Sequence, residues 1–141
     1  MRKIEHFHAI GRICRVLNDW AARPADFLPE SGGEVPGASV WALSADPVKR
    51  RYIDGGTVCT LPFVIRRSVS GASPAEKVDA LGFFAQCTAY LCSHTALLST
   101  DGFQCDGIRQ VTTPAKTAVF ADGTVEYAAQ YVMEYRTKQT E

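Results

Sequence analysis

The segment 124–137 places the strongest constraint on the fold. Apolar side chains fill every second position from Val125 to Tyr135, whereas the positions between them include Glu126 and Glu134. Successive side chains of a β-strand point to opposite faces of the sheet. The pattern therefore predicts one long strand with a packed face and a face in water, which is typical of an antiparallel sheet.

A second strand is predicted where apolar side chains alternate on one face, at Cys59, Leu61, Phe63, Ile65 and Val69. Asp-Gly-Gly at 54–56 precedes it, and glycine readily adopts the positive φ that a tight turn requires. We therefore expect a hairpin that joins a strand over 48–53 to this one. Pro62 lacks a backbone donor, so we expect it where the strand faces an edge or a bulge.

Two segments have helical spacing instead. Over residues 2–22, apolar residues recur at steps of three or four, which makes one stripe on a helix. Ser73, Pro74 and Glu76 form a capping box with proline at the first helical position, so a second helix is expected over about 74–94. The buried stripe predicted for this helix comprises Val78, Leu81, Phe84, Ala85, Thr88, Leu91 and Cys92.

Shorter strands are predicted over residues 39–45, 105–112 and 116–121. Residues 23–38 contain three prolines and three glycines, which predicts a long loop. A chain of 141 residues suits one domain. The expected fold is therefore a single α/β domain of the α+β kind, 1–141, with a mainly antiparallel sheet, long hairpins and two main flanking helices.

The charges balance, with 15 basic and 15 acidic side chains. The chain therefore lacks the positive field that drives phosphate-backbone binding, which argues against sequence-specific nucleic-acid recognition. A net charge near zero favours self-association. No apolar run is long enough to span a bilayer and the N-terminus has no apolar signal core, so we expect no membrane partner and synthesis in a cytoplasm. The five cysteines form no CxxC pair, which favours reduced, mostly buried thiols.

No sequence pattern for catalysis, a metal or a cofactor is present. His6 and His8 lie roughly 200° apart around a helix, and His94 has only Cys92 nearby. No serine lies in a GxSxG frame, and the glycines at 55 and 56 lack a Walker lysine or a GxGxxG frame. We therefore expect no enzyme activity; a small hydrolase with a site assembled from distant residues is the remaining alternative.

Two basic clusters flank the Asp-Gly-Gly turn, and in a hairpin they could come close on opposite strands. They either form a solvated rim or meet acidic groups of a neighbouring subunit, and surface pairs usually contribute little energy. We expect the hairpin tip and the loop at 23–38 to become ordered on meeting a partner. The candidate interface residues are Lys49, Arg50, Arg51, Asp54, Arg66 and Arg67.

Three short motifs in a fixed order carry a family resemblance. They are Tyr-Ile-Asp-Gly-Gly at 52–56 before a strand, Ala-Leu-Gly-Phe-Phe at 80–84 in the capped helix, and Tyr-Val-Met-Glu-Tyr at 131–135 in the closing strand. With this order of elements, the whole chain resembles the tail terminator proteins of long-tailed bacteriophages, a group also called phage minor capsid proteins. The family pattern assigns no role to residues 23–38.

The resemblance implies a small α/β subunit that forms a six-membered ring on the finished tail tube of a virion assembled in the host cytoplasm. The ring stops polymerisation of the tube and offers its other face to the neck of the filled head. The implied partners are copies of the chain itself, the tail tube protein and a neck or head-completion protein, with no cofactor. A neck or head–tail adaptor protein, or another minor capsid protein of the same virion, is the alternative.

Overall fold

Two long antiparallel strands, β4 (Thr57–Ser70) and β7 (Thr124–Thr137), form the centre of the sheet. Their register continues without a shift from one end to the other, and Phe63 is the partner of Tyr131. The rings of these two residues stack with their centroids 5.4 Å apart. The apolar positions predicted for both strands are buried, so both alternations are confirmed.

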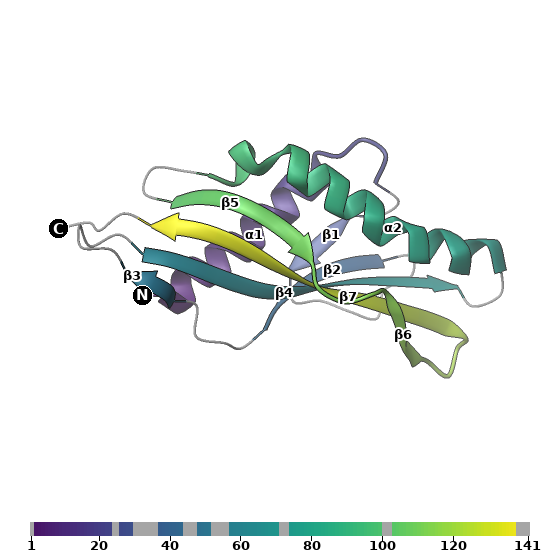
Figure 1. Ribbon diagram of the computed structural model, residues 1–141. Helices are drawn as coiled ribbons and strands as arrows, with labels where there is room; N and C mark the ends of the chain where they lie inside the picture. Colours follow the sequence, from purple (N-terminus) through teal and green to yellow (C-terminus); the bar gives the residue numbers. More distant parts are fainter. Residues whose placement is uncertain are drawn as a thin grey trace.

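The computed structural model describes residues 2–23, 26–29, 37–43, 48–51, 57–70, 74–99 and 103–137. It contains a seven-stranded sheet with the order β1-β2-β4-β7-β5, in which β3 pairs with β4 and β6 pairs with β7 (Figure 1). Only β1 and β2 run parallel to each other among these pairs. The shorter strands are β1 (Phe27–Pro29), β2 (Gly37–Ala42), β3 (Val48–Arg51), β5 (Phe103–Gln110) and β6 (Ala115–Val119).

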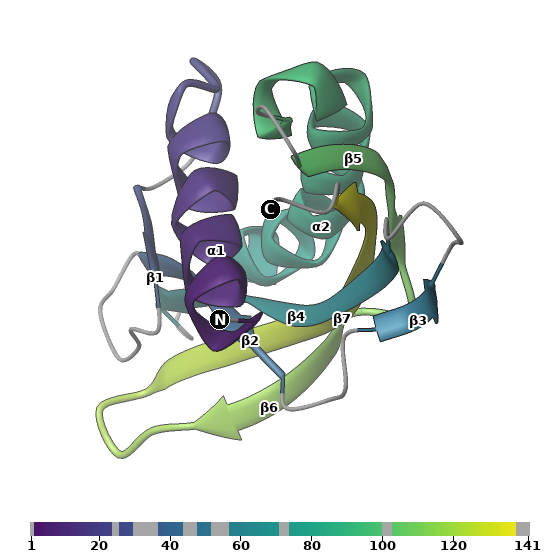
Figure 2. The ribbon, with the colours of Figure 1, turned by 90° about the vertical axis from the view of Figure 1, so that its left-hand side faces the viewer.

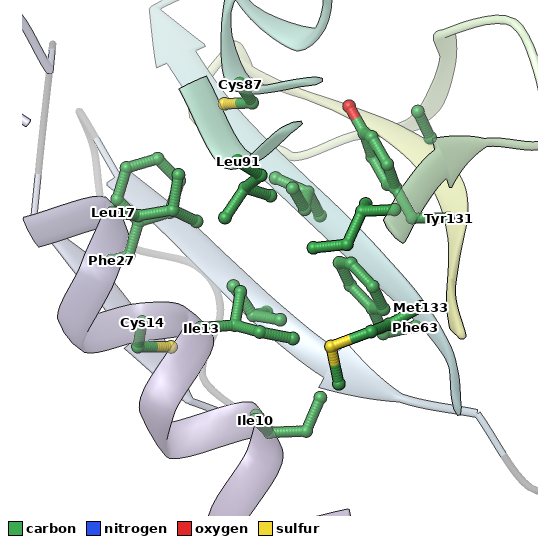
Figure 3. Packing of buried hydrophobic residues seen from close by; sticks show 14 of the residues in the cluster. Ile10, Ile13, Cys14, Leu17, Phe27, Phe63, Cys87, Leu91, Tyr131 and Met133 are labelled. Carbon is green, nitrogen blue, oxygen red and sulfur yellow. The ribbon is translucent and has the colours of Figure 1, made fainter. Parts of the chain in front are cut away.

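Two helices, α1 (Arg2–Asn18) and α2 (Pro74–Ser93), lie side by side on one face of the sheet (Figure 2). A short 3-10 helix, η1 (Thr95–Leu98), follows α2. The core lies between this layer and the sheet, where Ile13 and Leu17 from α1 point toward Leu91 of α2 and Phe63 of β4 (Figure 3). The expected α+β fold with two flanking helices is confirmed.

The buried stripe of α2 differs from the predicted one. Val78 and Leu81 are 68% and 42% exposed, whereas Phe83 is buried. Ala85 and Cys92 of the predicted stripe are exposed as well. Phe83 packs against Phe27 and Trp20, with ring centroids 5.7 and 6.4 Å away, and these contacts fix the rotation of the helix. Both stripes have helical spacing, so periodicity alone could not choose between them. The buried residues of α2 are Ala80, Phe83, Phe84, Cys87 and Leu91.

The expectation of a continuous loop over 23–38 is wrong at its centre, because Phe27–Pro29 forms β1. Asn18 explains this strand. Its Nδ2 donates to the Phe27 carbonyl at 3.0 Å, and its Oδ1 accepts from the Phe27 N–H at 2.7 Å. The last residue of α1 thus holds the chain while the Phe27 ring enters the core. Residues 24–25 and 30–36 lie outside the described residues.

Two polar positions of the central strands behave differently. Glu126 was expected on the wet face, but it is only 7% exposed, and its Oε2 accepts a hydrogen bond of 3.0 Å from Thr117 Oγ1.

Pro62 lies between the part of β4 that pairs with β3 and the part that pairs with β2. Its carbonyl accepts a hydrogen bond from the Leu43 N–H at 2.9 Å. Among the described residues no strand pairs with β4 at Pro62 on the side of β2 and β3, so the expectation of a position that faces an edge is confirmed.

From the two hydrogen bonds between Asn18 and Phe27 we predict a specific loss of stability. Asn18→Ala removes both hydrogen bonds and leaves the polar backbone of Phe27 without its partners, so the free energy of unfolding should fall by about 1–3 kcal/mol. Urea unfolding followed by circular dichroism measures the change. Asp19→Ala, at the exposed neighbouring position, should change stability by no more than about 0.5 kcal/mol. Equal effects of the two variants would contradict the assigned role of Asn18.

Candidate subunit interface

The two basic clusters do not lie close together. Arg50 and Arg51 pair with Val58 and Thr57 at the start of β4, whereas Arg66 lies opposite β2. At about 3.3 Å per residue, Arg66 is roughly 25 Å along β4 from Val58. The expected approach of the clusters is therefore wrong, because the turn pairs β3 only with the first residues of a much longer strand.

The individual candidates have different surroundings. The backbones of Lys49, Arg50 and Arg51 belong to β3, while their side chains and the whole of Asp54 lie outside the described residues. Their role at an interface stays a prediction. Arg66 and Arg67 are adjacent on β4 and point to opposite faces of the sheet.

Arg66 lies on the face away from the helices. Its Cζ is 4.6 Å from the centroid of the Trp41 ring, and Trp41 Nε1 donates to Ser39 Oγ at 2.9 Å. A guanidinium over an aromatic face is stabilised by the ring quadrupole. This stack therefore presents a cation and an indole together on the outer face of the sheet.

Arg67 lies on the helix side, in the series of positions that is otherwise apolar. Its Cζ is 5.5 Å from the centroid of the Phe83 ring. Its Nε and Nη1 atoms are buried and donate to no acceptor among the described residues, although the residue as a whole is partly exposed. Burial lowers the pKa of Arg67, and the nearby Cys87 and Glu76 oppose that shift. Arg67 also lines a hollow of about 570 Å³ between β4 and α2.

The β6–β7 hairpin extends beyond the body of the sheet (Figures 1 and 2). Its turn is fixed by Gly123 at a φ of 91° and by Asp122 Oδ1, which accepts from the Thr124 N–H at 3.0 Å. That hydrogen bond lowers the pKa of the exposed Asp122 carboxyl. Val119 and Phe120, 62% and 40% exposed, form an apolar pair at this tip, which we call the tip pair.

Sheet edges are a second feature that the sequence reasoning did not identify. Within the described ranges, β3 pairs only with β4 and β6 pairs only with β7, on the two opposite sides of the central pair. An edge strand presents unpaired N–H and C=O groups to any approaching chain. A break in the apolar alternation at Val119-Phe120, just before the Asp122-Gly123 turn, was the available sequence signal for the tip pair.

Comparison with solved structures identifies a similar fold in a virion. A chain of the virion of a native gene transfer agent particle superposes with a TM-score of 0.50 at 14% identity, covering 96% of this chain and 91% of that one. The two chains share their fold. No family model and no curated protein matches the sequence.

The described residues contain few groups suited to chemistry. Within them, no three His, Cys, Asp or Glu side chains converge on a point that could hold a metal ion. Among the described helices, none is long and apolar enough to cross a membrane. The hollow beside Arg67 combines charged and apolar walls, which suits the binding of a polar group.

The thiols are free, and four of the five are buried, as expected; Cys92 is exposed. Burial raises the pKa of Cys105 to about 11 and raises that of Cys87 further. Both groups are therefore protonated at neutral pH, and a thiol rather than a thiolate is a poor nucleophile. Burial also raises the pKa of the Tyr131 hydroxyl, which donates to the Phe84 carbonyl at 3.0 Å.

These pKa values predict a loss of stability in alkali. The folded state keeps the Cys105 proton above the ordinary thiol pKa of 9.0, so the stability it contributes is complete below pH 9 and lost as the pH rises toward about 11. Denaturant unfolding from pH 8 to 11 should show this fall. Cys105→Ala should lower stability at every pH but make the alkaline fall shallower. An unchanged slope in that variant would contradict the assignment.

Proposed function

We propose that the chain is a virion structural protein that forms a hexameric ring, caps the tail tube and offers an interface to the neck of the head. The observation that carries the proposal is the shared fold with a chain of a gene transfer agent virion, across nearly the full length of both chains. The order of the three motifs at 52–56, 80–84 and 131–135 supports the finer assignment to a tail terminator.

The arrangement of the sheet suits a ring. Its two sides end in different strands, with β1 and β3 on one side and β5 and β6 on the other, so the two lateral surfaces of one subunit are not alike. A repeated contact between unlike surfaces is heterologous, and it closes into a ring when the rotation between neighbours fits. The balanced charge of the chain leaves little long-range repulsion between copies.

The tip pair supplies an anchor for such a contact. Two large apolar side chains at the end of a protruding hairpin reach a neighbour more readily than side chains on the body of the sheet. Burying them against a partner removes apolar surface from water, which favours association. We assign the tip pair to the subunit–subunit contact.

The mechanism consists of binding alone. Ring formation on the tube end occupies the surface that the next tail tube protein needs, so growth stops. The opposite face of the ring is then the attachment surface for the neck or head-completion protein. No bond is made or broken, and no residue of the chain acts as a catalyst in this scheme.

A neck or adaptor protein of the same virion is the second candidate, since the structural likeness is to a chain of a whole virion particle. The two candidates are distinguished by the particles that assemble when this chain is missing. A terminator leaves tails that grow beyond their normal length, which electron microscopy measures directly. Tails of normal length that fail to join heads would instead show a neck protein, and complete particles would exclude both roles.

The tip pair can be tested by charge insertion. Val119→Asp in the hairpin should abolish ring formation, measured by native mass spectrometry on tube ends, because a carboxylate would have to be buried in the contact. Leu97→Asp is the matched control, because it also replaces an exposed aliphatic side chain by a carboxylate, at a 56% exposed position in η1. Its rings should form normally. The assignment would be contradicted if the Val119→Asp protein formed rings, or if neither variant formed them.

A further inference from the structure

The hollow beside Arg67 lies between α2 and the last residues of β4. Its volume of about 570 Å³ falls within the range of about 300–1,000 Å³ that is usual for binding sites. Its apolar wall includes Phe83 and Val78, and the Val78 side chain is 68% exposed. Its charged residues are Arg67, Glu76 and Asp79, so carboxylates outnumber cations. An occupant that matches these walls has apolar side chains with a cation beside them.

The β6–β7 hairpin carries this combination on its helix-side face. Lys116 is the register partner of Tyr127. Val119, of the tip pair, is the partner of Val125. Cross-strand partners share a face, and both of these β7 residues are buried in the core.

A β-bulge is the reason that Lys116 and Val119 share a face. Residues three apart in a regular strand point to opposite faces, but the register shifts between Lys116 and Ala118, and a bulge re-aims the side chains that follow it. Lys116 and Val119 are both exposed. The hairpin therefore presents a cation beside the apolar tip pair.

The tip pair and the hollow lie at the same height along the long strands. Val119 is opposite Val125, and Val125 is opposite Val69, which lines the hollow. These three residues form one rung across β6, β7 and β4, and Figure 1 shows the hairpin and the start of α2 at the same end of the molecule. A rotation about an axis along the strands leaves this height unchanged. Copies related by such a rotation can therefore bring the tip of one to the hollow of the next.

The hollow also lies on the side of the rung away from β6. It is lined by Ala22, which follows α1, and α1 packs against β1 and β2. The described pairing of β2 with β4 ends at Ser68, one residue before the rung. The tip pair and the hollow thus belong to the two unlike sides of the subunit, as a heterologous contact requires.

Gly82 gives an independent indication that the hollow receives a group from outside. It lies inside α2 and lines the hollow, although glycine in a helix interior is less stable than alanine. A Cβ added at Gly82 would meet no atom within 4 Å. The packing of the described residues therefore does not require glycine there, whereas an incoming side chain needs the space.

We propose that the hollow receives the tip pair of the neighbouring copy in the ring, with that copy's Val119 against Val78 and its Lys116 beside Asp79. The inference rests on the proposed ring and names the surface that covers the tip pair. Lys116 and Asp79 are both exposed, and neither forms an ion pair among the described residues. The contact removes exposed apolar side chains of both copies from water, which favours association.

Engineered cysteines identify what the tip pair contacts. Val119→Cys chains and Val78→Cys chains, one of them tagged, are mixed and oxidised both free in solution at about 1 mM, the range of weak contacts, and on tail tubes. A disulfide forms only where the two Cα atoms come within about 7 Å. The linked dimers should contain one chain of each kind. The unchanged chain, with its exposed Cys92, gives the background.

Two results of this experiment overturn the proposal. One is the absence, in both settings, of mixed dimers above the background. The other is an equal yield of dimers between two Val119→Cys chains, because it would mean that tips contact tips.

An exchange of charges tests the orientation of the tip in the hollow. Lys116→Glu and Asp79→Lys each place like charges side by side, so each should weaken the contact about fivefold, measured by sedimentation equilibrium. The double variant restores opposite charges and should recover most of the loss. A double variant as weak as the two single variants, or weaker, overturns the proposal.

A variant that fills the hollow tests its role without touching the tip. Gly82→Leu should prevent the contact, while the thermal unfolding midpoint stays the same or rises because leucine is the better helix former. Ala89→Leu, at an exposed position of α2 outside the hollow, is the matched control and should keep the contact. Normal association of the Gly82→Leu protein, or equal loss in both variants, overturns the proposal.

Failure of this inference and failure of the proposed function give different results. Rings on tube ends without the disulfide between Val119→Cys and Val78→Cys chains leave the terminator role standing and reject the hollow as the receptor. The same disulfide in a chain that does not limit tail length supports the contact between copies and rejects the terminator role instead.

Discussion

The rest of the structure depends on the register between β4 and β7. The two strands pair along their whole lengths without a shift, which places Phe63 beside Tyr131 on the face that the helices cover. A slip of one residue would turn every one of these side chains to the other face of the sheet. The register between β4 and β7 determines the hydrophobic core, the positions at which both helices pack and the extension of the β6–β7 hairpin.

The two faces of β4 and of β7 were predicted well, because local alternation in the sequence determines which side chains share a face of a strand. The pairing of β4 with β7 and its register were not predicted, because they join two segments that lie far apart in the chain. The rotation of α2 was missed, since the ring contacts of Phe83 with Phe27 and Trp20 join residues far apart in the chain. Strand β1 was missed for the same reason: two hydrogen bonds from Asn18 hold it, and no local pattern announces them.

The candidate interface was predicted less well. The basic clusters were found as residues, but the length of β4 separates them, and adjacent strand positions send Arg66 and Arg67 to opposite faces. Only the structure distinguishes Arg66, stacked on Trp41, from Arg67, whose Nε and Nη1 are buried and have no acceptor among the described residues. The alternating apolar run did not indicate that the position of Arg67 borders a hollow.

These features fit a subunit whose stable core carries surfaces that have no partner among the described residues, namely an apolar tip and two unlike sheet edges. Each one is a disadvantage for a monomer, and under the proposed function an assembly would cover it. Electron cryo-microscopy of the intact virion that contains this chain tests that account most directly. We predict six copies of the chain in one closed ring at the head-proximal end of the tail tube. Density for the chain along the tube, in the capsid wall or nowhere in the particle would contradict it.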